Sequence, residues 1–129
     1  MVNEEMVVGV MRSALISVSK KDKISLQELR IKMELNNEQD SVVCSVLKGK
    51  EFVSDLTWAR ILGMKVVFAS VVINTIKNML LKLSQENEIE SSEINARIYA
   101  VDASANPNIY IYNGKKPLKK IDASDILSN

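Results

Sequence analysis

Two tyrosines and four lysines lie close together near the end of the chain, and they are the residues best suited to bind a ligand. Tyr110 and Tyr112 alternate with isoleucines, and the lysines that follow a predicted turn are Lys115, Lys116, Lys119 and Lys120. Aromatic rings beside lysines are able to stack on bases and hold phosphates. Alternatively, the lysines protect an edge strand from aggregation. Alternation directs Lys116 to the side of Ile111, so the charges do not share one face, which favours edge protection.

The residue types present argue against most catalytic chemistry. The chain has no histidine, which excludes histidine triads, histidine metal sites and the usual neutral-pH base. With one cysteine it has no set of thiolates for zinc or iron–sulfur clusters. The glycines stand at 9, 49, 63 and 114 and form no phosphate-binding loop. We therefore expect no enzyme activity, no catalytic residue, no metal and no cofactor.

Cys44 and two serine–lysine pairs are the remaining candidates for nucleophiles. Cys44 lies in the apolar segment SVVCSVL, where burial would raise the thiol pKa and make it inert. Ser17 precedes Lys20 by three positions, and Ser45 precedes Lys48 by three. Lysine activates such a hydroxyl only when it is desolvated. We interpret the cysteine as structural and both pairs as solvent-facing.

Composition predicts one globular domain over 1–129. Hydrophobic residues make up 47% and charged residues 26%, and the net charge is +1. A nucleic-acid-binding protein usually has an excess of basic residues, so the near-neutral charge argues against that class of function. The single cysteine and the two glutamates near the N-terminus favour a cytoplasmic protein. We expect no membrane segment, because the uncharged apolar run 66–76 is shorter than the roughly 20 residues that a span needs.

Apolar periodicity predicts four helices within residues 1–87, at about 4–20, 25–35, 41–49 and 56–84. The second begins with a Ser25-x-x-Glu28 capping box. In the fourth, β-branched residues make a strand the competing interpretation of 64–73. No internal repeat is apparent.

Strands are predicted within residues 94–129. Residues 94–101 alternate, and the Asn113-Gly114 pair predicts a type I′ turn between 109–112 and 115–121. In that register Ile109 faces Leu118, and both would pack on helices. The predicted fold class is therefore α+β, with three or four helices on a small antiparallel sheet that ends in a β-hairpin (94–121).

Two functions follow from this architecture. Val67 and Val71 add apolar surface to the long helix, so we expect a homodimer and a non-catalytic interaction or adaptor protein with an unknown protein partner. The alternative is a DNA- or RNA-binding regulator that uses a helix-turn-helix-like segment, 25–50, or the basic hairpin, 110–120. The first half of the would-be recognition helix lacks Arg, Asn, Gln and Lys, which favours the interaction protein.

Overall fold

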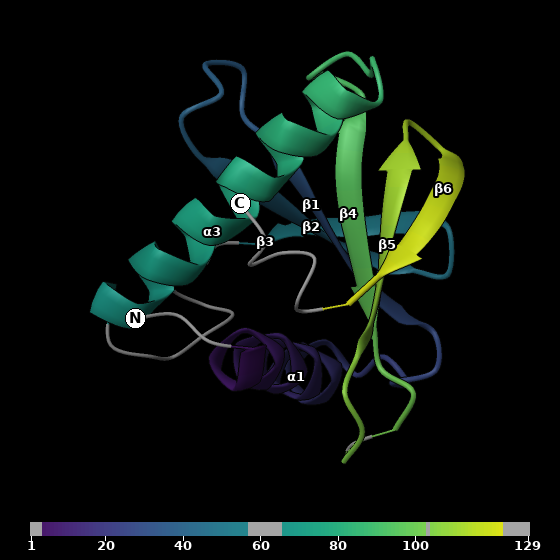
Figure 1. Cartoon of the computed structure of the whole chain (residues 1–129). Helices are drawn as coiled ribbons and strands as arrows, with labels where there is room; N and C mark the ends of the chain where they lie inside the picture. The colour runs from purple at the N-terminus through teal and green to yellow at the C-terminus, as the bar shows by residue number, and fades with distance from the viewer. Residues whose placement is uncertain (1–3, 57–65, 103, 123–129) are drawn as a thin grey trace.

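The computed structural model describes residues 4–56, 66–102 and 104–122, and these form an α+β fold (Figure 1). The helices are α1 (Glu4–Asp22) and α3 (Val66–Glu86). The strands are β1 (Leu29–Leu35), β2 (Val42–Lys48), β3 (Glu51–Leu56), β4 (Ile94–Tyr99), β5 (Asn108–Asn113) and β6 (Lys116–Ile121). They form one antiparallel sheet in the order β3-β2-β1-β4-β5-β6. Neither described helix has the length and apolar content to cross a membrane.

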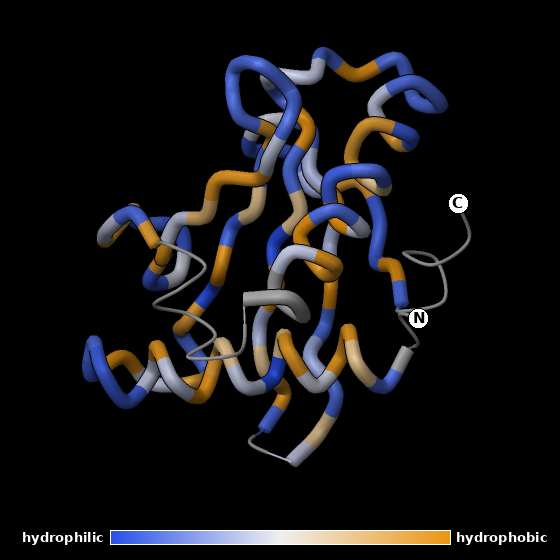
Figure 2. Tube along the Cα trace, turned by 90° about the vertical axis from the view of Figure 1, so that its left-hand side faces the viewer, coloured by the Kyte–Doolittle hydropathy of each residue, from blue (hydrophilic) through white to orange (hydrophobic). Residues whose placement is uncertain are grey.

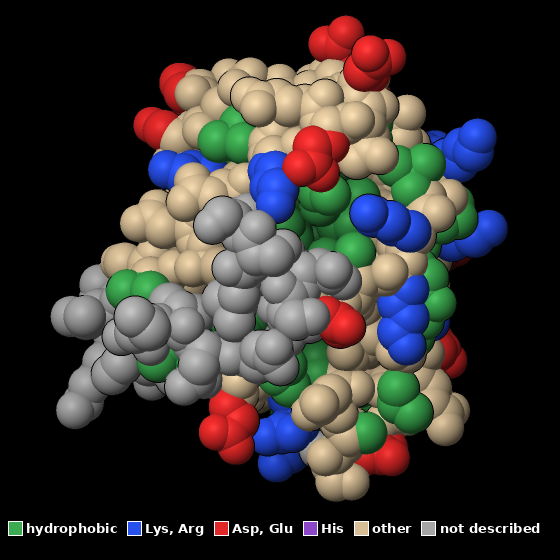
Figure 3. Space-filling view, viewed as in Figure 1, with side chains coloured by type: hydrophobic (Ala, Val, Ile, Leu, Met, Phe, Trp, Pro, Cys, Tyr) green, Lys and Arg blue, Asp and Glu red, His purple; other side chains and the backbone are tan. Residues whose placement is uncertain are grey.

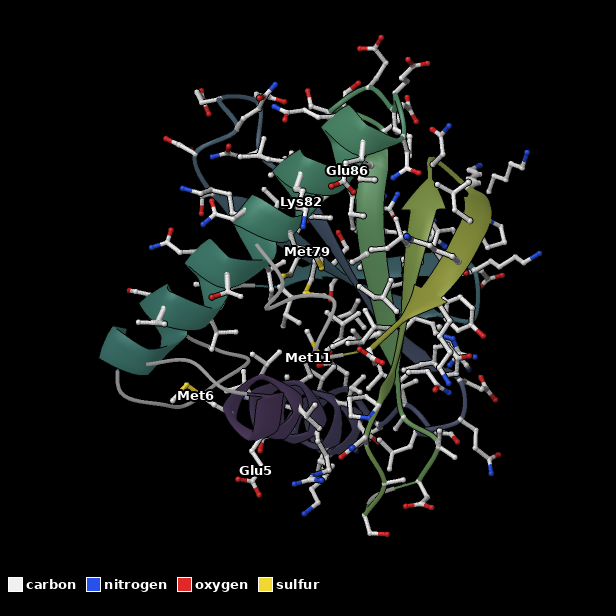
Figure 4. All side chains as sticks on the ribbon, viewed as in Figure 1. Glu5, Met6, Met11, Met79, Lys82 and Glu86 are labelled. Carbon is white, nitrogen blue, oxygen red and sulfur yellow. The ribbon has the colours of Figure 1, made fainter. Side chains whose placement is uncertain are left out.

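Both helices pack against the same face of the sheet (Figures 1 and 2). In Figure 1, α1 is seen nearly end-on and α3 runs obliquely across the view. Met11 of α1 and Met79 of α3 direct their side chains into the layer between helices and sheet (Figure 4). Alternate strand residues supply the other side of this core, as in β1, where Leu29, Ile31, Met33 and Leu35 are all buried. The opposite face of the sheet carries no described helix.

The predicted helices 25–35 and 41–49 are wrong, because these segments form β1 and β2. In β1 apolar residues alternate strictly with charged ones, a period of two that outweighs the capping-box signature. The box marks only one turn, in which the amides of Glu28 and Leu29 donate to the carbonyl of Ser25 at 3.0 and 2.9 Å.

The other helix predictions agree with the structure where it describes them, except at Leu56, which ends β3. The predicted helix 4–20 corresponds to α1. The predicted helix 56–84 corresponds to α3 from residue 66 onward, so the competing strand interpretation of this segment is wrong there. The first portion of that prediction, residues 57–65, lies outside the described residues.

The hairpin 94–121 is confirmed as strands, but its turn and register differ from the prediction. The turn residues are Gly114 and Lys115, and Asn113 pairs with Lys116 as part of the ladder. Gly114 has φ +61°, whereas Asn113 is not among the residues with positive φ, so the type I′ prediction is wrong. A bulge follows, and Ile121 therefore takes the place opposite Ile109 that was predicted for Leu118.

The structure reveals an internal repeat of a helix followed by three strands. Positions 65 residues apart have the same role: Ser19 and Ser84 each donate their hydroxyl to a carbonyl, of Ile24 at 2.6 Å and of Ile89 at 2.5 Å. Gly49 and Gly114 begin equivalent turns, with φ of +63° and +61°. Even the bulges match, between Val46/Leu47 and between Ile111/Tyr112.

Few residues of the two repeats are identical, which explains why the sequence alone did not show them. Identical pairs within the described residues include Val7/Val72, Leu15/Leu80, Ser19/Ser84, Ile24/Ile89, Glu28/Glu93, Gly49/Gly114 and Lys50/Lys115. Most mark helix ends and turns, where backbone geometry restricts the residue type. Elsewhere only the alternation of buried and exposed positions is shared.

The two repeats meet at the seam between β1 and β4, about a pseudo-two-fold axis. The register pairs Ile31 with Ile98 and Met33 with Ala96, which are equivalent pairs in reversed order. At the centre Lys32 pairs with Arg97, its own counterpart 65 positions later. The sheet is thus a pair of three-stranded units joined side by side within one chain.

Candidate binding site on the open face of the sheet

The face of the sheet opposite the helices, here called the open face, forms a shallow groove of about 990 Å³. Side chains of all six strands and of the two repeat turns line it, and they include five lysines or arginines and two glutamates. The basic residues are Arg30, Lys32, Lys50, Arg97 and Lys115. Three tyrosines, Tyr99, Tyr110 and Tyr112, lie on β4 and β5 of the second repeat. The groove therefore combines positive charge with aromatic surface.

Arginines and tyrosines of the open face form two stacks. The Arg30 guanidinium lies 4.3 Å from the ring centre of Tyr99, whose ring stacks on Tyr110 with centroids 5.6 Å apart and planes inclined by 13°. In the second stack the Arg97 guanidinium lies 4.1 Å from the ring centre of Tyr112. Cation–π contacts of this kind hold both partners in place. The two stacks therefore hold both arginines and all three tyrosines of the groove against one another.

Hydrogen bonds fix Arg97 further. Its Nε donates to Oδ1 of Asn95 at 3.1 Å, and its terminal nitrogen donates to the carbonyl of Gly114 at 3.3 Å. Asn95, only 2% exposed, also donates to the Gly114 carbonyl at 3.0 Å. Burial lowers the pKa of the Arg97 guanidinium, while Tyr112 and Glu34 oppose that shift, and an arginine stays charged in any case. Asn95 thus links the orientation of Arg97 to the repeat turn.

Like charges face each other at the pseudo-two-fold axis. Lys32 and Arg97 are direct cross-strand neighbours, an arrangement that destabilises a sheet unless an anion offsets it. Glu34 supplies part of that compensation through its carboxylate, 3.5 Å from Nζ of Lys32. Arg30 adds a third cation from the same face of β1. The centre of the groove therefore carries more positive charge than its neighbours neutralise.

The Tyr99 hydroxyl stays protonated at neutral pH. Burial raises the pKa of Tyr99, and its hydrogen bond with Tyr110 raises that pKa further. A protonated phenol both donates and accepts. The groove thus offers O–H groups beside its guanidinium N–H donors.

The structure brings together only some residues of the nucleic-acid contact that the sequence offered as the alternative. Tyr110, Tyr112 and Lys115 line the groove. Lys116 and Lys119 lie on the edge strand β6 outside its lining, and Lys120 borders another cavity beside α1. Figure 3 shows lysine and arginine side chains along the right-hand border of the view, over the β5–β6 hairpin. The cluster is thus divided between groove and sheet edge.

The other predicted residues lie away from the groove. Cys44 is buried in the core, and burial, with a contribution from Glu34, raises its thiol pKa. Val71 is 39% exposed on α3, and the side chain of Val67 lies outside the described residues.

Sequence reasoning missed Arg30, Arg97 and Tyr99. Arg30 falls on a helix predicted from the sequence, and the predicted strand 94–101 does not by itself single out Arg97 or Tyr99. The available signal was the alternation in LRIKMEL and INARIY, which places charged or aromatic residues on one face of two neighbouring strands.

Among the residues that the structure describes, no group of acidic or cysteine side chains is arranged to hold a metal ion. No protein-family model, curated protein or solved structure matches the chain.

Proposed function

We propose that this protein is a small non-catalytic interaction module that holds a protein partner on the open face of its sheet. The observation that carries the proposal is the pair of Arg–Tyr stacks on a face that no described helix covers. Side chains held in place before binding lose little conformational entropy on association. Arginine and tyrosine are also the residue types enriched where protein interfaces gain most of their binding energy.

The chemistry of the groove supports binding rather than catalysis. Its central groups are guanidinium, ammonium and phenol groups, which bind anions and acceptors, and Glu34 is engaged by Lys32. The thiol of Cys44 is buried on the other side of the sheet with a raised pKa, the reverse of what a nucleophile needs.

Self-association is a separate element of the proposal. Val71 is an exposed apolar residue on α3, which suits a contact between two copies through the helical layer. Such a contact would leave the open face available to the partner. We place the protein in the cytoplasm, because a lone cysteine suits a reducing compartment.

One of the two segments proposed for nucleic-acid binding does not have the structure that the proposal requires. Residues 25–50 contain β1 and β2, so a helix-turn-helix there is wrong. The hairpin route persists through Tyr110 and Tyr112, which share the groove with Arg97.

Selection of displayed peptides tests whether the open face is the interaction surface. Random peptides of about 12 residues are selected on the immobilised protein and then tested against two double variants. Binding should be lost in Tyr110→Ala/Tyr112→Ala, which removes groove side chains. It should persist in Val101→Ala/Leu118→Ala, which truncates exposed apolar residues outside the groove. Peptides that bind both variants equally well would place the interaction surface elsewhere.

A further inference from the structure

We infer that the partner segment held by the open face is an extended, acidic stretch of polypeptide, whose spaced carboxylates pair with Arg30, Lys32 and Arg97. This inference rests on the proposed function and adds the chemistry of the ligand. Three observations carry it: the unbalanced charge at the seam, the occupied faces of the tyrosine rings, and the glutamates that interrupt the basic lining.

The charge at the seam calls for an anion at a defined place. Lys32 and Arg97 are directly opposed at the pseudo-two-fold axis, and Arg30 follows on the same face of β1. Only Glu34 forms an ion pair with this cluster among the described residues, at 3.5 Å from Lys32. Carboxylates placed over Arg30 and Arg97 would satisfy the remaining N–H donors, and arginine suits planar, bidentate recognition of carboxylate.

The tyrosine rings already stack on side chains of the groove, which reduces the ring surface left for nucleic-acid bases. A base stacks on an open ring face, but the ring of Tyr99 has Arg30 on it and is stacked with Tyr110. One face of the Tyr112 ring is covered by Arg97. At Tyr99 a ligand therefore meets the ring edge and the hydroxyl group, which suit the carbonyl, amide and carboxylate groups of a peptide.

The glutamates of the groove favour discrete charges over a continuous polyanion. Glu34 lies beside Lys32, and Glu93 borders the groove near the turn at Gly114. A phosphate backbone, with a charge on every nucleotide, would meet both carboxylates. A peptide can place its acidic residues over the arginines and neutral residues over the glutamates. The complementarity is thus to a protein segment with spaced acidic side chains.

The experiment compares probes of one length on the intact protein by fluorescence anisotropy. The first probe is a peptide of about 12 residues in which glutamate alternates with threonine, a composition suited to extended chain. The second has glutamine in place of every glutamate, the third has lysine there, and the fourth is an oligothymidylate of matched length. Each is measured at about 50 and about 200 mM NaCl, since screening weakens charge pairing.

Two double variants of equal charge give the matched comparison. Arg30→Gln/Arg97→Gln removes two cations from the groove, and Arg12→Gln/Lys77→Gln removes two from the helices, at positions equivalent in the two repeats. We expect the groove variant to bind the glutamate peptide with an affinity lower by about tenfold or more. The helix variant should keep an affinity within about twofold of the wild type. Arg30→Lys/Arg97→Lys keeps charge without the planar stack and tests the groove if the glutamine variant fails to fold.

Each alternative outcome overturns the inference in its own way. Equal affinity for the glutamate and glutamine peptides, or no binding of either, would contradict the inference of an acidic ligand. The proposed interaction surface would then still be tested by the display selection. Tighter binding of the oligothymidylate than of the glutamate peptide would show that the groove is a nucleic-acid site and not a peptide site. Concentration-dependent association that blocks the probes would identify a second copy as the occupant. Failure of the display selection as well would overturn the proposed function itself.

Discussion

At the scale of single residues, Glu34 controls the balance of charge on the open face. Its carboxylate compensates Lys32 at the seam, where Lys32 and Arg97 are opposed. We predict that Glu34→Gln lowers the free energy of unfolding by about 0.5 kcal/mol, because the cations then repel each other without compensation. The same change should tighten binding of the acidic probe peptide. Urea unfolding at low and high salt measures the first effect, which salt should reduce.

Glu86→Gln is the control for that prediction. It breaks a comparable ion pair, between Glu86 and Lys82 at 3.9 Å, on α3 and outside the groove (Figure 4). It should leave peptide affinity unchanged. If both glutamine variants bind the peptide more tightly and to the same extent, the effect comes from net charge and not from the seam.

Cys44 provides a test of the core at the same scale. Burial raises its thiol pKa, so the reactive thiolate is scarce in the folded protein at neutral and mildly alkaline pH. We predict that a thiol reagent labels Cys44 only as fast as the protein unfolds, and at full speed in urea. The measurement is the labelling rate against urea concentration. Rapid labelling without urea would contradict the burial of this side chain.

At the scale of elements, the two repeat turns allow a matched pair of substitutions. Gly49 and Gly114 both have the left-handed conformation that side chains disfavour, at φ +63° and +61°. We predict that alanine at either position lowers the free energy of unfolding by about 1 kcal/mol. At Gly114 the added Cβ would lie 2.8 Å from Oε2 of Glu93, a flexible end that can move, so any additional loss is small.

Gly9 is the control of opposite sign for those glycines. It lies within α1, and outside its own helix none of the described residues has an atom within 4 Å of a Cβ placed there. Gly9→Ala should therefore raise the stability, by up to about 1 kcal/mol, because alanine favours a helix. Chemical denaturation of the three variants compares them directly. Wild-type stability of both turn variants would mean that the turns do not require glycine.

The prediction of elements from sequence succeeded where one period was long and unambiguous. Helix α1 followed from its apolar pattern, and so did strands β5 and β6, although not their turn and register. For β1 and β2 the sequence also carries a capping signature and a short apolar segment, and these favour helices over the alternation that the structure follows. That conflict concealed the site, since Arg30 and Lys32 reach the groove only if β1 is a strand beside β4. Pairing across the sheet is a long-range property that no local pattern contains.

At the scale of the whole molecule, the predicted dimer depends on the surface of α3. We predict that Val71→Asp lowers the sedimenting mass to that of one chain, because a charge cannot be buried in an apolar contact without a partner. Val101→Asp, at an exposed apolar residue after β4, should have no effect. Sedimentation velocity over a range of concentrations measures both. A wild type that stays monomeric throughout would contradict the self-association.

The seam between the repeats also has a consequence for how the chain folds. Within each repeat, neighbouring strands are joined by short connections and pair locally, whereas β1 and β4 are 65 positions apart and must find each other across the molecule. We expect the two halves to form early and to dock late. Because either half presents a matching edge strand, at high concentration the second half of one chain can dock onto the first half of another. Rapid removal of denaturant from a concentrated solution of unfolded protein should then trap exchanged pairs of chains. Such pairs would separate only when the chains unfold again.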